Sequence, residues 1–156
     1  GRLMEIRPYA DPDKDAVIAL WHACELVRPW NDPERDIARK LTEQPELFLV
    51  AIEDGMPAGS IMAGFEGHRG WVNYLAVAPS QRGRGLGRRL MEEVEARLAE
   101  RGCPKLNLQV RASNTAVIDF YRRLGYVQDD VLSFGRRLIE DMAGPAGGTG
   151  GAGGAG

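Results

Sequence analysis

The chain has 156 residues, of which 44% are hydrophobic and 27% are charged, and its formal net charge is −2 at pH 7. These values are typical of a soluble globular domain with one hydrophobic core. A net charge this close to zero argues against a protein built mainly to coat DNA or an anionic membrane. No apolar run approaches the roughly 18 residues of a membrane-spanning helix. We therefore expect a cytoplasmic protein with no nucleic-acid or membrane partner, and the sequence leaves a homodimer open.

The two ends of the chain differ in composition from the part between them. Residues 1–3 precede Met4 and are expected to be a leader or extraneous residues. Residues 143–156 are mostly glycine and alanine with little to bury, so we expect a flexible tail. Residues 4–142 contain no repeat and no linker-like stretch, which predicts a single domain. The two cysteines lack metal-ligand spacing, and no metal site is expected.

Apolar periodicity predicts the secondary structure of this domain in chain order. Strands are expected at residues 4–9, 47–53, 58–67, 71–77, 105–110, 126–128 and 131–134. Helices are expected after a cap at Asp11 or Asp13, then at residues 33–43 with Asp32 as the cap, at 85–101 and at 116–124. This order predicts an α/β fold of the α+β type, in which helices flank both faces of a central mixed, mostly antiparallel sheet.

The most unusual stretch is VAPSQRGRGLGRRL at residues 77–90, where three glycines and four arginines fall within eight residues. Glycines let consecutive backbone N–H groups turn into one concavity, and the next helix adds unpaired N–H groups and a positive dipole end. This combination favours a phosphate or pyrophosphate site, with a solvated basic turn as the alternative. The stretch matches neither the dinucleotide fingerprint nor the nucleotide P-loop. The candidate binding residues are Arg82, Gly83, Arg84, Gly85, Leu86, Gly87 and Arg88.

The same stretch resembles the GNAT family of N-acetyltransferases. RGRGLG at residues 82–87 matches the family signature R/Q-x-x-G-x-G/A, which holds the pyrophosphate of acetyl-CoA. YLAVAP, just before it, is similar to the family's central strand, and NLQVRASNTAVIDFYRRLGYV at residues 107–127 is similar to its second motif. LVRPWNDPERDIARK and RGCPK resemble the YpeA group within the family. The resemblance covers about residues 4–141. It implies acetyl-CoA as co-substrate, bound where the strand at 71–77 splays from the strand at 105–110.

The resemblance also implies roles for single residues. The backbone of Leu75, Ala76 and Val77 would pair with the pantetheine arm, and the Val77 N–H would polarise the thioester carbonyl. Asn114 would contact the CoA arm, with helix capping as the alternative or additional role. Tyr121 would protonate the departing CoA thiolate, with a core packing role as the alternative.

Gln109 is a departure from the pattern. The ribosomal-protein alanine acetyltransferases, which share the L-x-V-R-A-S-N sequence, have a glutamate there that serves as the base. Glutamine cannot accept a proton from an ammonium group, so another residue or a water chain must do so. Glu66, His68 and Asp32 are the candidate bases.

The acceptor side is less well marked. In this fold the loop between the first two helices commonly lines the acceptor pocket. The candidate acceptor-binding residues are Arg28, Trp30, Asn31, Asp32, Arg69 and Gln109. Arg28 and Arg69 could clamp a carboxylate, which would suit an amino acid or a similar small amine. A peptide N-terminus is the next option.

Three classes of function compete. An acetyl-CoA-dependent N-acetyltransferase acting on a small amine or a peptide N-terminus accounts for the most residues. A CoA-binding regulatory module with weak or no catalysis is the alternative, which Gln109 favours and Tyr121 disfavours. A nucleic-acid binder using the arginine run is disfavoured by the net charge and by the lack of interleaved aromatic residues.

Overall fold

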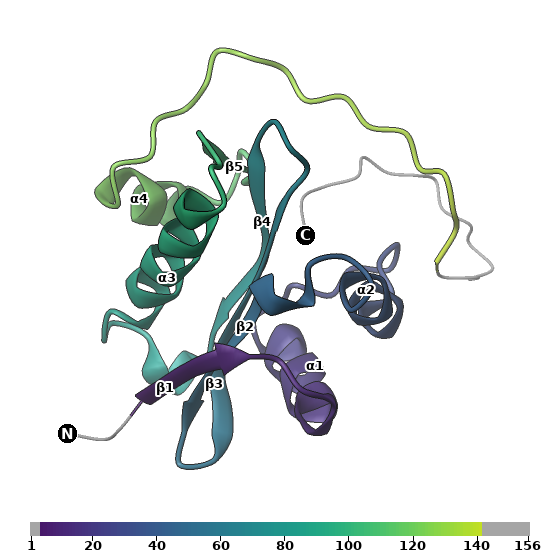
Figure 1. Ribbon diagram of the computed structural model, residues 1–156, viewed down its shortest axis with the longest axis vertical. Helices are drawn as coiled ribbons and strands as arrows, with labels where there is room; N and C mark the ends of the chain where they lie inside the picture. Colours follow the sequence, from purple (N-terminus) through teal and green to yellow (C-terminus); the bar gives the residue numbers. More distant parts are fainter. Residues whose placement is uncertain (1–3, 142–156) are drawn as a thin grey trace.

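The computed structural model describes residues 4–141 and shows a five-stranded sheet with helices on both faces (Figure 1). The strands are β1 (Met4–Pro8), β2 (Phe48–Glu53), β3 (Met56–Phe65), β4 (Gly70–Val77) and β5 (Leu106–Leu108). They lie side by side in chain order; β1 to β4 are antiparallel to one another, and β5 is parallel to β4. This arrangement confirms the expected fold class. The expectations for residues 1–3 and 142–156 lie outside the described residues.

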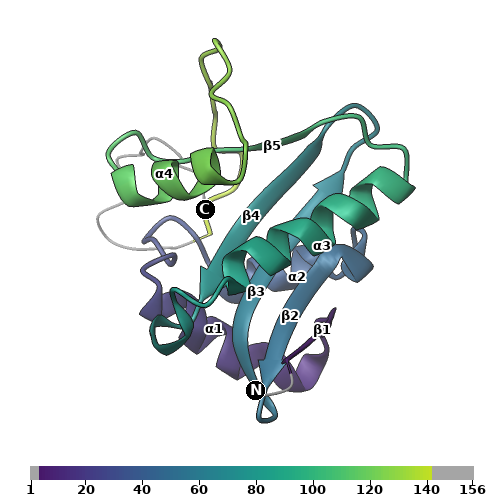
Figure 2. The same ribbon diagram turned by 90° about the vertical axis from the view of Figure 1, so that its left-hand side faces the viewer.

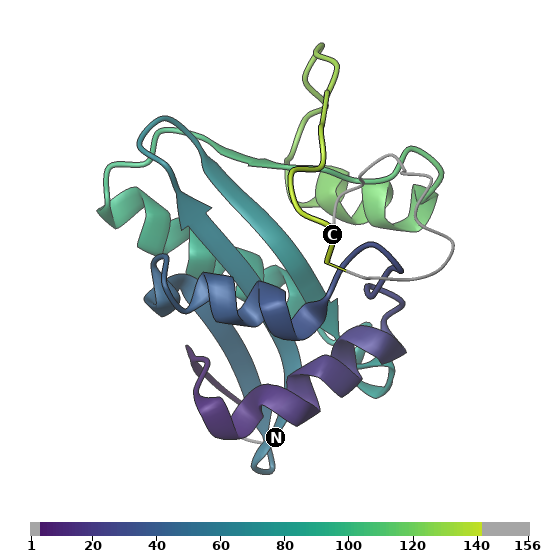
Figure 3. The ribbon, with the colours of Figure 1, turned by 90° about the vertical axis from the view of Figure 1, so that its right-hand side faces the viewer.

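Two helices cover each face of the sheet (Figures 2 and 3). On one face lie α1 (Lys14–Ala23) and α2 (Pro33–Lys40), and on the other lie α3 (Leu86–Glu100) and α4 (Thr115–Arg123). Asp32 caps α2 as expected, because its carboxylate accepts hydrogen bonds from the N–H groups of Glu34 and Arg35 at 3.0 and 3.3 Å. Short 3₁₀ turns occupy Asp11–Asp13, Pro45–Leu47 and Pro79–Gln81. None of the helices within residues 4–141 is long and apolar enough to cross a membrane.

The interior strand β2 explains why the sheet has two cores. Phe48 and Val50 pack under α1 and α2, whereas Leu49 and Ala51 pack under α3, and all four side chains are fully buried. Successive side chains of a strand point to opposite faces. A strand covered on both faces therefore reads as a continuous apolar run, which is how FLVAI appears in the sequence. Burial of each large apolar side chain contributes about 1.5–3 kcal/mol.

A bulge in β4 changes which face its side chains occupy. Val72 packs on the α3 side, but Tyr74 and Ala76, which have the same parity, pack on the α1 side. Between the pairs Met62–Asn73 and Ser60–Ala76, β4 advances three residues while β3 advances two. Tyr74 takes a positive φ of 53° at this point. An extra residue of this kind reverses the faces and bends the strand.

Three side chains hold the bulge. The Trp21 indole stacks on the Tyr74 ring, with centroids 3.9 Å apart and an interplanar angle of 13°. The Trp21 Nε1–H donates to Ser60 Oγ at 2.9 Å, and the Ser60 hydroxyl donates to the Tyr74 carbonyl at 3.3 Å. The Tyr74 hydroxyl donates to the Asp36 carboxylate of α2 at 2.5 Å. These contacts offset a backbone conformation that costs a non-glycine residue about 1–3 kcal/mol.

The two final strands predicted at residues 126–128 and 131–134 are not formed. Residues 126–141 run as an irregular segment from α4 across to α2, visible at the top of Figure 1. Side chains tie this segment to the domain, including the ion pairs Lys105–Asp129 at 2.8 Å and Arg39–Asp141 at 2.5 Å. Its apolar side chains stay in solvent, with Phe134 92% exposed. Sequence alternation indicates that a segment can form a strand, but a strand also requires a neighbouring edge to pair with.

We predict that Ser60→Ala destabilises the domain. The change leaves the buried Trp21 N–H without a partner and removes a hydrogen bond to the Tyr74 carbonyl, so the free energy of unfolding should fall by about 1–3 kcal/mol. Urea unfolding followed by tryptophan fluorescence measures this. Ser80→Ala, at an exposed position, is the control and should have little effect. A loss below about 0.5 kcal/mol for Ser60→Ala would show that the hydrogen-bond chain does not support the bulge.

Candidate active site

The site begins where β4 and β5 separate. The two strands pair only over Gly70–Val72 and Leu106–Leu108. Beyond Val72, β4 continues to Val77 paired with β3 alone among the described strands. The residues 73–77 therefore present an edge that no described strand covers. Such an edge can accept an added extended chain through backbone hydrogen bonds.

The direction of the backbone at Val77 follows from its neighbours. The Ala78 N–H donates to the Ala58 carbonyl of β3 at 2.8 Å. Because successive N–H groups of a strand point to opposite edges, the Val77 N–H points away from β3, toward the open edge. The Val77 carbonyl points the same way and accepts from Cys24 Sγ at 3.2 Å and from Arg82 Nε at 3.3 Å.

The glycine–arginine loop, residues 82–89, follows soon after this edge. Gly83 and Gly85 have φ values of +82° and +80°, and a Cβ added to either would meet no atom within 4 Å. Gly85 is the N-cap of α3, so the loop opens onto the unpaired N–H groups of the helix. The space beside both glycines is thus open, and the N–H groups at the start of the helix can bind a phosphate or pyrophosphate group there.

The structure separates the four arginines of this loop into two pairs. Arg82 and Arg84 turn back to the protein: Arg82 contacts Val77 and Cys24, and Arg84 donates to Gln81 at 2.6 Å. Arg88 and Arg89 are exposed, and their side chains make no hydrogen bond or ion pair within residues 4–141. The second pair is therefore available to an anion in the loop.

Glu53 at the end of β2 contacts the residues at the start of the loop. Its carboxylate is 8% exposed and accepts from Gln81 Nε2 at 2.6 Å, and Arg84 lies 4.0 Å away. Gly87 serves a different purpose from Gly83 and Gly85. It lies inside α3, and a Cβ there would come within 3.0 Å of the Phe120 ring of α4. Gly87 thus sets the close packing of α3 against α4.

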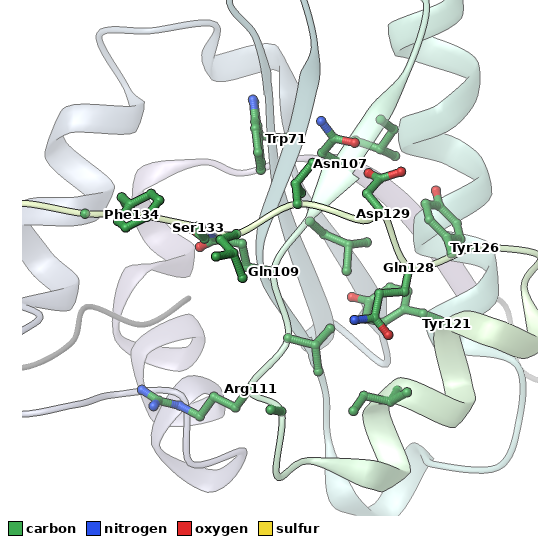
Figure 4. Close-up of a pocket in the computed structure, with 18 of the residues that line it drawn as sticks. Trp71, Asn107, Gln109, Arg111, Tyr121, Tyr126, Gln128, Asp129, Ser133 and Phe134 are labelled. Carbon is green, nitrogen blue, oxygen red and sulfur yellow. Dashed lines mark hydrogen bonds between the residues drawn. The ribbon is translucent and has the colours of Figure 1, made fainter.

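A large cleft lies beside β5. It measures about 1870 Å³ and is bounded by residues 105–113, by α4 and by the segment 124–139; we call it the β5 cleft. Trp71 of β4 also lines it. Figure 4 shows Trp71, Gln109, Arg111 and Tyr121 among its side chains.

Tyr121 combines burial with access to the β5 cleft. Its side chain is 8% exposed and packs edge-on against Phe120 and Tyr126, with centroids at 5.0 and 5.8 Å. Burial raises the pKa of the Tyr121 hydroxyl to about 12. The hydroxyl therefore stays protonated at physiological pH and can act as a proton donor.

Gln109 and Asn114 occupy the chain between β5 and α4. Gln109 lines the β5 cleft, and its side-chain amide donates to the Ser133 hydroxyl of the C-terminal segment. Asn114 caps α4, since its side-chain oxygen accepts from the Val117 N–H at 3.3 Å.

Glu66, His68 and Arg69 lie in the turn between β3 and β4, at the end of β4 that is paired with β5. The Glu66 carboxylate accepts from the N–H groups of His68 and Arg69, which lowers its pKa. The Arg69 guanidinium donates to the His68 carbonyl at 2.9 Å. None of the three lines the β5 cleft. The structure does not bring them together with Tyr121.

The loop between α1 and α2 carries the remaining candidates. The Arg28 carbonyl accepts from the Asn31 N–H at 2.9 Å, and Asp32 is engaged as the α2 cap and with Arg35 at 3.5 Å. Trp30 lies next to Arg111, whose guanidinium carbon is 5.6 Å from the indole ring centre. Within residues 4–141, no group of three or more histidine, cysteine, aspartate or glutamate side chains is placed to hold a metal ion.

Sequence reasoning missed three residues near this site. Glu53 ends the predicted strand at 47–53, Arg111 lies in the stretch 107–127 and Asp36 lies in the predicted helix at 33–43, and none of them was given a role. Burial raises the pKa of Asp36, although its hydrogen bond from Tyr74 acts in the opposite direction. Each gains its partners only from distant parts of the chain, and no local pattern in the sequence signals this.

Comparison with known sequences gives a consistent family. The profile of the Acetyltransferase (GNAT) family matches residues 15–126. Acetyltransferase SG1711 of Sodalis glossinidius is 55% identical over 139 residues, which cover 88% of this chain and 98% of that protein. Acetyltransferase ECA0875 of Pectobacterium atrosepticum is 52% identical over 138 residues, with the same coverage.

Solved structures share the fold. The aminoglycoside N-acetyltransferase AAC(6')-Iy in complex with CoA superposes with a TM-score of 0.71 at 20% identity, covering 89% of this chain and 97% of that one. The ribosomal-protein-S18-alanine N-acetyltransferase of Escherichia coli gives a TM-score of 0.65 at 26% identity, covering 79% and 77%.

We predict that Gly85→Val weakens CoA binding by at least about tenfold while the domain stays folded. Valine strains the positive φ and places a branched side chain in the open loop. Gly102→Val is the matched control, because Gly102 also has a positive φ, of +84°, with nothing within 4 Å, but it lies at the far end of α3. Calorimetric titration with CoA measures both. Equal CoA affinity in the two variants would show that the loop does not bind the phosphates.

Proposed function

Since the chain belongs to the GNAT family of acetyltransferases, we propose that it moves an acetyl group from acetyl-CoA to a primary amine by direct attack. The acceptor is a small, amino-acid-like amine or a peptide N-terminus. One observation carries the proposal: an open glycine loop at the start of α3 follows directly after an uncovered edge of β4. The buried Tyr121 hydroxyl in the neighbouring cleft supports it.

The chain's own groups bind and polarise the donor. Acetyl-CoA, when bound, supplies the acetyl group activated as a thioester. The uncovered edge at Leu75, Ala76 and Val77 pairs with the pantetheine arm, and the Val77 N–H donates to the thioester carbonyl oxygen as negative charge develops on it. The glycine loop and the N-terminus of α3 hold the pyrophosphate, and Arg88 and Arg89 add charge.

Proton transfers complete the reaction. The amine nitrogen forms a bond to the carbonyl carbon, and the bond from that carbon to sulfur breaks. The Tyr121 hydroxyl donates a proton to the departing sulfur. The amine proton leaves through water, because Gln109 has no basic group and Glu66 and His68 lie in the turn at the other end of β4. We place the enzyme in the cytoplasm.

We expect acetyl-CoA to be consumed in the presence of a suitable amine. A screen of amino acids, small amines and short peptides, followed by the appearance of free CoA thiol, measures this. The alternative, a CoA-binding module without catalysis, predicts CoA binding with no thiol release above the uncatalysed rate for any acceptor. That result across the whole panel would replace the enzymatic proposal with the alternative.

We predict that Tyr121→Phe lowers kcat by about 10²-fold, the range associated with a positioned general acid. Only the hydroxyl is lost, so packing and CoA affinity should remain. Tyr126→Phe is the matched control: it removes a neighbouring hydroxyl, which donates to Glu95 at 2.5 Å, and should keep kcat within a few-fold. A Tyr121→Phe enzyme within about twofold of the wild type would assign the proton donation to water.

A further inference from the structure

A buried carboxylate lies next to the start of the glycine–arginine loop. The Glu53 side chain is 8% exposed, and it comes from β2, two strands away from β4 in the sheet. Glu53 reaches the loop because it pairs with Met56 at the start of β3, and β3 also receives the hydrogen bond from Ala78 after β4. A negative charge repels a phosphate. By its charge alone, Glu53 opposes the binding of an anion in the loop, so its position requires another explanation.

Two hydrogen bonds connect Glu53 to the loop. The Gln81 side-chain amide donates to the Glu53 carboxylate at 2.6 Å, and the Gln81 side-chain oxygen accepts from the Arg84 guanidinium, also at 2.6 Å. The same guanidinium nitrogen lies 4.0 Å from the second Glu53 oxygen. Gln81 thus bridges an acid and a base, and this arrangement fixes the orientation of its amide.

The bridge holds the short connection between the two parts of the donor site. Residues 78–82 join the uncovered edge of β4 to the glycines of the loop, and Gln81 ends the 3₁₀ turn of this connection. The next residue, Arg82, donates to the Val77 carbonyl at 3.3 Å. The connection is therefore held by side chains at two successive residues, and these contacts set where the loop lies relative to the edge.

The glycines of the loop cannot hold this position themselves. At Gly83 and Gly85, the place of a Cβ has no other atom within 4 Å. Glycine has the greatest backbone freedom, so a glycine loop loses more conformational entropy when it becomes ordered. A loop that is ordered before the ligand arrives loses less of this entropy on binding and binds more tightly. Side chains held at the start of the loop supply this order.

We propose that Glu53 is a positioning residue for the phosphate loop. Through Gln81, it holds the loop in the geometry that binds the pyrophosphate of the donor. Glu53 itself does not touch the donor in this role, and Arg84 compensates its charge. The role rests on the proposed use of acetyl-CoA.

The sign of one substitution separates positioning from charge. Glu53→Leu removes both the hydrogen bond from Gln81 and the negative charge. If Glu53 positions the loop, CoA should bind about tenfold or more weakly. If only the charge matters, CoA should bind more tightly. Calorimetric titration of the full chain with CoA measures this, and equal or tighter binding would overturn the proposal.

Two further variants test the path through Gln81. Glu53→Gln keeps an oxygen that can accept from Gln81, so the CoA affinity should stay within about threefold of the wild type. Gln81 is less buried than Glu53, so Gln81→Leu tests the same contact with less risk to folding. It should weaken CoA binding as much as Glu53→Leu does, and the double variant should be no weaker than either. Equal losses in Glu53→Gln and Glu53→Leu, or additive losses in the double variant, would overturn the proposal.

Asp13→Leu is the matched control for a purely structural effect. Asp13 is also a buried carboxylate, 7% exposed, and it also holds a 3₁₀ turn, because it accepts from the Ala10 N–H at 2.9 Å and from Arg7 at 2.8 Å. It lies just before α1, on the face of the sheet opposite α3 (Figure 1). Asp13→Leu should lower the melting temperature and keep the CoA affinity. An equal loss of CoA affinity in Asp13→Leu and Glu53→Leu would mean that Glu53 only stabilises the fold.

The same titrations separate this proposal from the proposed function. Absence of CoA binding by the wild-type chain would remove the proposed use of acetyl-CoA. Binding of CoA by the wild type that Glu53→Leu leaves unchanged would remove only the positioning role of Glu53.

Discussion

The bulge at Tyr74 is the constraint on which the site depends. One extra residue in β4 turns Tyr74 and Ala76 toward α1, and a bulge of this kind bends a strand. The pairing of β4 with β5 ends at Val72, just before the bulge, and the edge beyond it is covered by no described strand. The positive φ of Tyr74 is held by the Trp21 ring, by Ser60 and by Asp36. Contacts from α1 and α2 on one face of the sheet thus hold the bulge in β4. The glycine loop before α3 lies next to the same uncovered edge on the other face.

Much of the fold could be read from periodicity because both faces of the sheet are covered. The apolar run of β2 and the four-residue spacing of Leu86, Leu90 and Val94 in α3 follow directly from burial. The bulge could not be read, since YLAVA at residues 74–78 is a continuous apolar run that fits either face of a covered sheet, and an inserted residue leaves no compositional mark. The prediction of strands at residues 126–128 and 131–134 was wrong for a related reason. The apolar residues in 131–134 describe side chains that suit a strand, whereas strand formation depends on a backbone partner elsewhere.

In the candidate site, too, some features could be predicted from the local sequence and others could not. Glycines before an apolar helix are a local signal in the sequence, and Gly83 and Gly85 take positive φ values in the structure. The roles of the arginines are not local. Arg84 is held by Gln81 near Glu53, which comes from the end of β2, while Arg88 and Arg89 remain available. Identical residue types in one short stretch thus differ in role because of a strand about thirty residues earlier, which only the folded chain brings close.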